Sequence, residues 1–165
     1  MRITLADIQT RPTAINKDLS GGYGTSSDFG NGWAAWLVKR FKRNTVKLPV
    51  LMLGYLAAIL RARGHEVRVT HGPPVPGTDL YLIYTSLVEH SAEVAFAQRV
   101  REAGGAKIGF VGSLASVMPD RFLPLGDFVI VGEAEGALLD LGESIELRGL
   151  IHGKRVEQLD SLPFP

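Results

Sequence analysis

The chain has 165 residues, and its 18 basic and 17 acidic side chains leave a formal charge of +1. This length suits one domain of ordinary size, and the balanced charge gives no electrostatic reason to expect nucleic acid, a membrane or an acidic partner. Cysteine is absent, which excludes disulfides, thiolate zinc sites and iron–sulfur clusters ligated by this chain.

Two features of the sequence bear on its location. The most apolar run, residues 48–60, is too short to span about 30 Å of hydrocarbon. The N-terminal segment MRITLADIQT leads straight into a strand-like pattern and lacks signal-peptide features. We therefore expect a cytoplasmic protein without stable membrane insertion.

Apolar runs and helical stripes alternate along the chain. A Gly- and Trp-rich insert at about residues 16–47 follows the first strand, and NGWAAWLVKRF within it predicts a short amphipathic helix. The next helix ends at Gly64, and a third, which Ser91 can cap, ends at Gly104. Predicted strands cover residues 3–6, 64–70, 79–85, 106–112 and 127–132, and GALLDL predicts a last short helix.

Strands that alternate with helices predict an α/β fold with a doubly wound, parallel, five-stranded sheet, here over residues 1–142. Residues 143–158 show two alternating polar–apolar segments around His152-Gly153-Lys154, the pattern of a β-hairpin with a glycine turn. Two prolines in residues 159–165 favour an extended path, as in a linker to a further domain.

In an open parallel sheet, ligands bind beyond the carboxyl ends of the strands, where the strand order reverses. Residues at these corners are mostly small or hydroxylated, so a ligand can approach the backbone, and Thr or Ser can hydrogen-bond to it. The alternative is that turns between strands and helices favour Gly and Ser in any case. The corners are Ala6-Asp7, residues 85–90, residues 112–116 and residues 132–136.

The last corner, VIVGEAEGALLDL, joins a strand end to acidic residues. Glu133 and Glu135 fall where a helix begins, so they can satisfy free amides and the positive end of the helix dipole. The functional alternative is that the backbone near Gly132 contacts a ligand. Carboxylates would repel phosphate, and neither GxGxxG nor GxxxxGK[ST] is present, which argues against a dinucleotide or a nucleoside triphosphate.

The chain resembles the N-terminal cobalamin-binding domain of radical SAM enzymes in the order of PVLMLGYLAAILRARGHEV, DLYLIYTSLVEHSAEVAFAQRVREAG, AKIGFVGSLASVMPD and DFVIVGEAEGALLDL. The resemblance covers nearly the whole chain after residue 48. It implies a flavodoxin-like (Rossmann-like) sheet, with the corrin of cobalamin over the carboxyl ends of the strands and the nucleotide tail in a crevice. It also implies a catalytic barrel with a [4Fe–4S] cluster and S-adenosylmethionine in the parent enzyme.

Matching positions by motif gives a set of candidate cofactor-binding residues. Ser113 stands where the family usually has a second glycine, which narrows the space for the tail. No catalytic residue and no metal ligand are assigned. The candidates are Thr85, Ser86, Leu87 and Val88 after the third strand, Gly112, Ser113 and Leu114 after the fourth, and Gly132, Glu133 and Glu135 after the fifth.

Related cobalamin domains carry Asp-x-His-x-x-Gly after the first strand, which puts a histidine on the lower face of the cobalt. Here that position reads ADIQTRP, without a histidine. Of the four histidines, we expect only His90 at the ligand end of the sheet, and we interpret it as a surface or helix-cap residue in preference to a cobalt ligand. The others are His65 at a helix end, His71 in a Pro-rich loop and His152 in the predicted hairpin.

The insert stands where the histidine loop of those domains would be. Its Trp33 and Trp36 could contact the corrin or dock the catalytic domain, because aromatic residues beside Arg and Lys are typical interface anchors. The alternatives are a helix packed on the sheet with a solvated basic face, and a helix on a membrane surface.

These observations favour a cobalamin-binding module of a larger cobalamin-dependent radical SAM enzyme, with methyl-transfer or related radical chemistry. Its partners would be cobalamin and the catalytic domain of the same parent chain, and the module alone would catalyse nothing. One alternative is a degenerate flavodoxin-like domain that binds no cofactor and positions substrate or the catalytic barrel. A stand-alone α/β enzyme is disfavoured, because no nucleophile, base and orienting acid group together in the sequence.

Overall fold

A computed structural model describes residues 1–10, 30–45, 50–140 and 147–165 of the chain. The chain divides into two compact units, of which the first comprises Met1–Gln9 and Leu51–Pro165 and the second comprises Thr10–Val50. All strands of the sheet belong to the first unit, so the sheet and its edges can be described without the insert.

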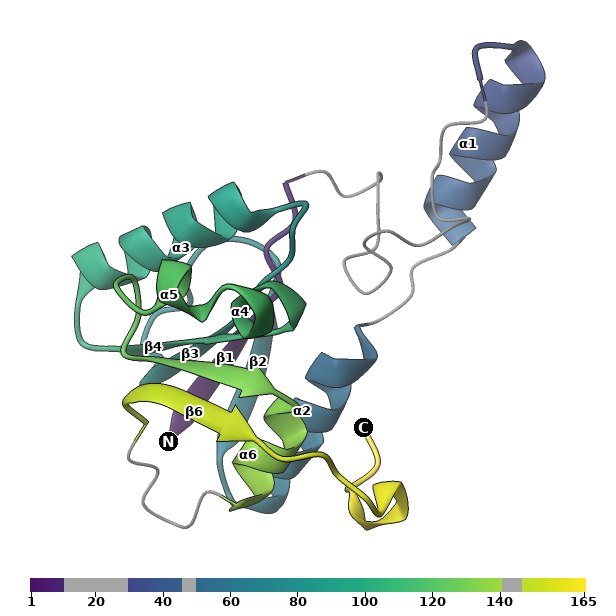
Figure 1. Cartoon of the computed structure of the whole chain (residues 1–165). Coiled ribbons are helices and arrows are strands. Elements are labelled where there is room, and N and C mark those ends of the chain that lie inside the picture. The colour runs from purple at the N-terminus through teal and green to yellow at the C-terminus, as the bar shows by residue number, and fades with distance from the viewer. Residues whose placement is uncertain (11–29, 46–49, 141–146) are drawn as a thin grey trace. The chain divides into compact units, whose positions relative to one another are not determined.

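The first unit is an α/β structure built on one open, all-parallel sheet (Figure 1). Its strands lie in the order β2-β1-β3-β4-β5-β6, and each neighbouring pair is parallel. The predicted α/β class and parallel sheet are therefore confirmed. The strands are β1 (Arg2–Ala6), β2 (Glu66–Thr70), β3 (Leu80–Tyr84), β4 (Lys107–Val111), β5 (Phe128–Gly132) and β6 (Gly149–Gly153).

The sheet has six strands and not the predicted five, because the predicted C-terminal hairpin is wrong. Residues 149–153 form β6, which pairs with β5 in parallel and places Gly153 opposite Gly132. His152 and Gly153 thus lie within a strand and not in a turn. The residues of this edge strand alternate between half-buried and exposed, which gives the polar–apolar pattern that also predicts a hairpin. Residues 143–146 of the predicted hairpin lie outside the described residues.

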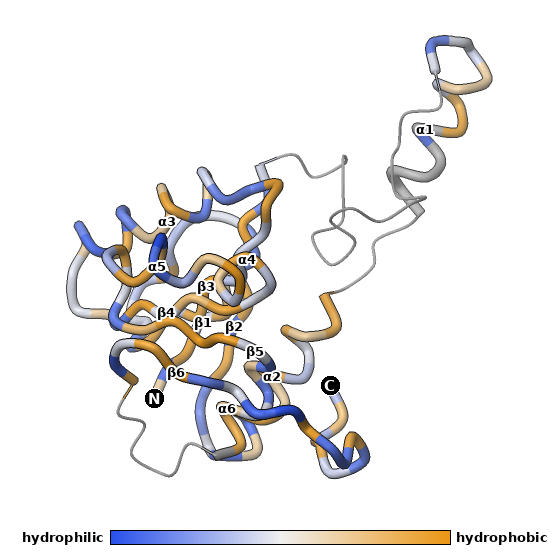
Figure 2. The backbone as a smooth tube through the Cα atoms, viewed as in Figure 1, coloured by the Kyte–Doolittle hydropathy of each residue, from blue (hydrophilic) through white to orange (hydrophobic). Residues whose placement is uncertain are grey.

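Helices cover both faces of the sheet (Figure 1). One face carries α3 (His90–Ala103), α4 (Ser113–Val117) and α5 (Pro119–Phe122), and the other carries α2 (Leu51–Ala62) and α6 (Ala134–Asp140). On the first face, Phe96, Phe110 and Phe122 form the centre of a buried cluster. Figure 2 shows the same distribution, with hydrophobic residues running along the middle strands.

The middle strand β3 is buried along its whole length, in the sequence LYLIY. Tyr81 and Ile83 belong to the cluster under α3. Their neighbours Leu80 and Leu82 are also at most 1% exposed and point to the opposite face, because side chains alternate along a strand. Burial on both faces explains why this strand is a continuous apolar run.

The glycines predicted at the C-terminal ends of two helices are confirmed, whereas the predicted N-terminal cap of α3 is not. Gly64 and Gly104 have positive φ angles of 80° and 71° after α2 and α3, which glycine adopts more readily than other residues. The predicted N-terminal cap of α3 is wrong, because Glu89 and not Ser91 holds the cap position. The Ser86 hydroxyl oxygen accepts a hydrogen bond from the Glu89 amide at 3.2 Å and so helps to start this helix.

The second unit contains α1 (Trp33–Thr45), so the predicted helix in the insert is confirmed. Its Trp33 and Trp36 side chains are exposed, and the Arg40 guanidinium carbon lies 6.0 Å from the centre of the Trp36 ring. Residues 16–29 and 46–47 of the predicted insert lie outside the described residues.

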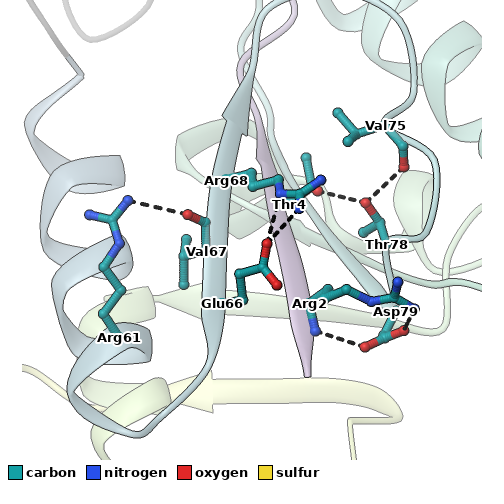
Figure 3. Close-up of polar contacts among 9 residues, drawn as sticks. All are labelled: Arg2, Thr4, Arg61, Glu66, Val67, Arg68, Val75, Thr78 and Asp79. Carbon is teal, nitrogen blue, oxygen red and sulfur yellow. Dashed lines mark hydrogen bonds and ion pairs between the residues drawn. The ribbon is translucent and has the colours of Figure 1, made fainter.

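Polar contacts at the amino edge of the sheet link β1 to the segment before β3 (Figure 3). The Arg2 amide and guanidinium donate to the two carboxylate oxygens of Asp79 at 2.7 and 3.1 Å, and these hydrogen bonds lower the pKa of Asp79. The Thr4 and Thr78 hydroxyls lie 2.7 Å apart, and Thr78 donates to the Val75 carbonyl oxygen at 2.9 Å. These contacts hold β1 beside β3 at the amino ends of the strands, whereas the candidate site lies at their carboxyl ends.

Candidate functional site

The strand order reverses between β1 and β3. The chain leaves β1, forms β2 on one side of it, and returns on the other side as β3. Ligands of open parallel sheets bind beyond the carboxyl ends at such a point. Because all strands are parallel, the corners that begin with Asp7, Thr85, Gly112 and Gly132 share this edge. The predicted site residues therefore lie along one side of the sheet.

The corner after β3 begins with a buried threonine. Thr85 Oγ1 donates to the Val111 carbonyl oxygen and accepts from the Ala115 amide, both at 2.9 Å. The Thr85 amide donates to the same carbonyl oxygen at 2.8 Å. Thr85 therefore ties β3 to β4 and α4, and its hydroxyl already donates one hydrogen bond and accepts another within the protein.

The next residue, Ser86, is held by a buried carboxylate from α3. Both Glu93 oxygens accept from the Ser86 amide, at 3.1 and 3.0 Å, and the Ser86 hydroxyl donates to Oε1 at 3.1 Å. Glu93 is 0% exposed, and a buried carboxylate requires such hydrogen bonds. Since the hydroxyls of Thr85 and Ser86 are engaged internally, a ligand at this corner would meet backbone and apolar side chains.

Large apolar side chains are exposed after β3 and at the end of α4. Leu87 and Val88, just after Ser86, are 71% and 44% exposed. Val117 and Met118, at the end of α4, are 79% and 40% exposed. We call Leu87, Val88, Val117 and Met118 the apolar rim. The two pairs follow the neighbouring strands β3 and β4, and apolar side chains gathered on a protein surface often mark a site for a ligand or a partner.

The corner after β4 is shaped by packing against β3. Gly112 has a φ of 109°, and a Cβ there would lie 2.7 Å from the Tyr84 ring and 2.9 Å from the Thr85 carbonyl oxygen. The lack of a side chain at Gly112 thus allows its backbone to pack closely against Tyr84 and Thr85. Of the other candidates here, Ser113 is exposed and Leu114 is buried, so only Ser113 offers its side chain to the surface.

The corner after β5 packs against the chain that follows β6. A Cβ at Gly132 would lie 2.8 Å from the Gly153 carbonyl oxygen, and one at Gly136 would lie 1.9 Å from the Lys154 carbonyl oxygen. The Ser116 hydroxyl accepts from the Gly132 amide at 3.0 Å and joins this corner to α4. These glycines therefore allow two backbone segments to approach closely.

The two glutamates of this corner have different surroundings. Glu133 Oε2 accepts from the Val156 amide at 2.7 Å, beyond β6. Burial raises the pKa of Glu135, the nearby Glu133 carboxylate raises it further, and a hydrogen bond from its own backbone amide opposes both. Glu135 is thus half-buried at the start of α6, whereas Glu133 contacts Val156, a contact that the sequence does not predict.

Sequence reasoning also missed a pair formed by Asp7 and His71. Ala6 and Thr70 are in register between β1 and β2, so the residue after each strand lies at the same edge. His71 Nδ1 lies 3.2 Å from Asp7 Oδ2 and 3.1 Å from the Asp7 carbonyl oxygen. Gln9 Nε2 donates to the same Oδ2 at 2.7 Å. The sequence could have indicated this pair, because His71 directly follows a predicted parallel strand, as Asp7 does.

The expectation that only His90 lies at the ligand end of the sheet is therefore wrong. His71 follows β2 directly, and its side chain is 62% exposed above an Asp7 carboxylate that is 1% exposed. His90 begins α3, with Nδ1 3.4 Å from the Leu87 carbonyl oxygen and Nε2 3.4 Å from the Ser91 hydroxyl. Its position at a helix start agrees with its interpretation as a near-cap residue.

Together, the fold and the edge define an α/β protein with an open parallel sheet and a candidate ligand site at its β1–β3 switch point. Comparison of the chain with protein-family models, curated proteins and solved structures finds no match. Among the described helices, none is both long and apolar enough to cross a membrane. Within the same part of the chain, no three His, Asp or Glu side chains come together as a metal site.

Proposed function

We propose that this chain is the cobalamin-binding module of a larger, cytoplasmic, cobalamin-dependent radical SAM enzyme. The order β2-β1-β3-β4-β5 is the flavodoxin-like one, in which a cofactor binds at the β1–β3 switch point. The resemblance in sequence order supplies the particular cofactor and the parent enzyme. The parent would contribute the catalytic barrel, the [4Fe–4S] cluster and S-adenosylmethionine.

The observation that carries this proposal is the apolar rim beside the switch point. Complete burial of a large apolar side chain contributes roughly 1.5–3 kcal/mol, so covering several of these residues would supply much of the affinity for a broad, flat ligand. A corrin has such a shape. Cobalamin would supply a cobalt-bound methyl group or related radical chemistry, while this chain binds the cofactor and orients it.

The residues fit a corrin better than they fit a sugar or a phosphate. The hydroxyls of Thr85 and Ser86, which could otherwise bind polar ligands, are engaged with Val111 and Glu93. The carboxylates of Glu133 and Glu135 lie at the same edge and would repel an anion. Contacts would thus come from the apolar rim, from the exposed Ser113 and from backbone at the corners after β3, β4 and β5.

Retention of hydroxocobalamin on gel filtration tests the proposal, with visible absorbance in the protein fraction as the expected result. Leu87→Asp should weaken binding by tenfold or more, because it places a charge in the proposed contact. Leu150→Asp is the matched control, since Leu150 is also exposed, at 42%, but lies on the edge strand β6. A colourless protein fraction, or equal loss in both variants, would contradict the proposal.

A second candidate is a flavodoxin-like domain that binds no cofactor and positions substrate or a catalytic barrel. It is favoured by the internal engagement of Thr85 and Ser86 and by the close contacts at Gly112 and Gly132, which explain the small corner residues without a ligand. In that case the apolar rim would be a docking surface. Failure to retain cobalamin together with binding of the purified catalytic domain would identify this function.

A further inference from the structure

We propose that His71, oriented by Asp7, is the axial protein ligand of the cobalt in the bound cofactor. This inference rests on the proposed function, because it needs cobalamin at the β1–β3 edge. It revises the expectation that no protein histidine ligates the metal. The ligand comes from the end of β2, while the absent motif would have placed it in the loop after β1.

The two contacts of His71 Nδ1 fix the tautomer of its ring. Nδ1 faces the Asp7 carboxylate at 3.2 Å and the Asp7 carbonyl oxygen at 3.1 Å, and both of these groups only accept hydrogen bonds. The proton of the neutral ring therefore resides on Nδ1, and Nε2 carries the lone pair. A carboxylate behind an imidazole is the arrangement that orients metal-ligating histidines and fixes their tautomer.

The support beneath the imidazole is rigid, and the ring itself is accessible. The Asp7 side chain is 1% exposed, its amide donates to the Thr70 carbonyl oxygen at 2.9 Å, and Gln9 donates to its carboxylate. The His71 side chain is 62% exposed. Within the residues that the structure describes, no hydrogen bond of Nε2 is found.

A single imidazole suits a metal that is already held by a cofactor. No group of three potential ligands exists among the described residues, so these residues do not form a metal cage of their own. The cobalt of a corrinoid needs only an axial donor, because the macrocycle supplies its equatorial nitrogens. His90 is the less suitable donor, since its Nδ1 lies 3.4 Å from the Leu87 carbonyl oxygen and its Nε2 lies 3.4 Å from the Ser91 hydroxyl.

Electron paramagnetic resonance of cob(II)alamin bound to the full chain tests this inference. The chain is produced with its histidine rings labelled with ¹⁵N, while the cofactor keeps natural ¹⁴N in its own base. An axial histidine nitrogen then splits the cobalt signal into doublets, whereas the cofactor's base splits it into triplets. We expect doublets in the wild-type protein, their loss in His71→Ala, and their persistence in the control His90→Ala.

The outcomes separate this inference from the proposed function. Bound cobalamin with triplets, or without nitrogen splitting, overturns the inference and leaves the proposed function standing. Doublets that persist in His71→Ala also overturn it, because another histidine would be the ligand. If the wild-type protein retains no cobalamin, both fail. Asp7→Asn, which weakens the support of Nδ1, should reduce the doublet fraction without abolishing retention of the cofactor.

Discussion

Replacing Gly136 with alanine tests why the corner after β5 is rich in glycine. An alanine Cβ at this position would lie 1.9 Å from the Lys154 carbonyl oxygen and 3.0 Å from its carbonyl carbon. Real Cβ atoms essentially never approach another heavy atom within 3.0 Å, so the Lys154 backbone or the start of α6 must move by about 1 Å. The obstacle is backbone, which yields less readily than the end of a flexible side chain.

We expect this Gly→Ala substitution to destabilise the protein, whereas Gly→Ala in an ordinary helix stabilises it. In an unobstructed helix interior, alanine is more stable than glycine by roughly 0.5–1 kcal/mol, whereas overpacking costs about 1–3 kcal/mol. We therefore expect Gly136→Ala to lower the free energy of unfolding by about 1–2 kcal/mol. Gly72→Ala is the control, because nothing lies within 4 Å of a Cβ there, and it should be neutral or stabilising by up to about 1 kcal/mol.

Urea denaturation of the two variants measures this difference, provided that the m-value stays constant. A Gly136→Ala protein as stable as the wild type would refute the reasoning from internal packing. If that stable variant also failed to retain cobalamin, the glycine would instead serve the approach of a ligand. The same substitution thus separates the two explanations for the glycine-rich corner.

Three further predictions concern buried polar groups and α1. Thr85→Val removes the acceptor of the Ala115 amide and should lower the free energy of unfolding by about 1–3 kcal/mol in urea; no loss would contradict the role of that hydroxyl. Because the folded state raises the pKa of Glu135 above its ordinary 4.5, wild-type stability should fall as pH rises through 4.5 to the raised value. Over that range Glu135→Gln should become the more stable protein in denaturation curves, and a difference independent of pH would count against this. The only tryptophans, Trp33 and Trp36, are 82% and 62% exposed, so fluorescence should peak at the long wavelength of tryptophan in water; a short-wavelength peak would mean that they are covered.

The strands that are buried on both faces could be predicted from the sequence. A run such as LYLIY in β3 has no polar face, and only a central strand of a parallel sheet buries all of it. The edge strand β6 could not be predicted in the same way. Its alternation of half-buried and exposed residues is shared by hairpins and edge strands, and only its pairing with β5 distinguishes them.

The sequence predicts where the candidate site lies in the fold, but not which residues contact one another there. The corners after β3, β4 and β5 do share one edge, because a parallel sheet places all carboxyl ends together. The sequence does not reveal that the Thr85 hydroxyl bonds to Val111, since that partner depends on the register of β3 with β4. The Asp7–His71 pair is hidden for the same reason, as its members lie 64 residues apart and meet through the register of β1 with β2.

The hydrogen bonds at this edge separate the residues that build the corners from those that face outward. Thr85 and Ser116 link neighbouring corners, and a network of satisfied buried hydrogen bonds rigidifies the structure around it. What these rigid corners expose is apolar at Leu87 and Val117 and basic at His71. A ligand recognised here would therefore meet apolar side chains and one imidazole, because the hydroxyls of Thr85 and Ser86 are engaged inside the protein. This combination agrees with the proposed cofactor, a broad macrocycle that carries a metal, better than with a nucleotide or a sugar.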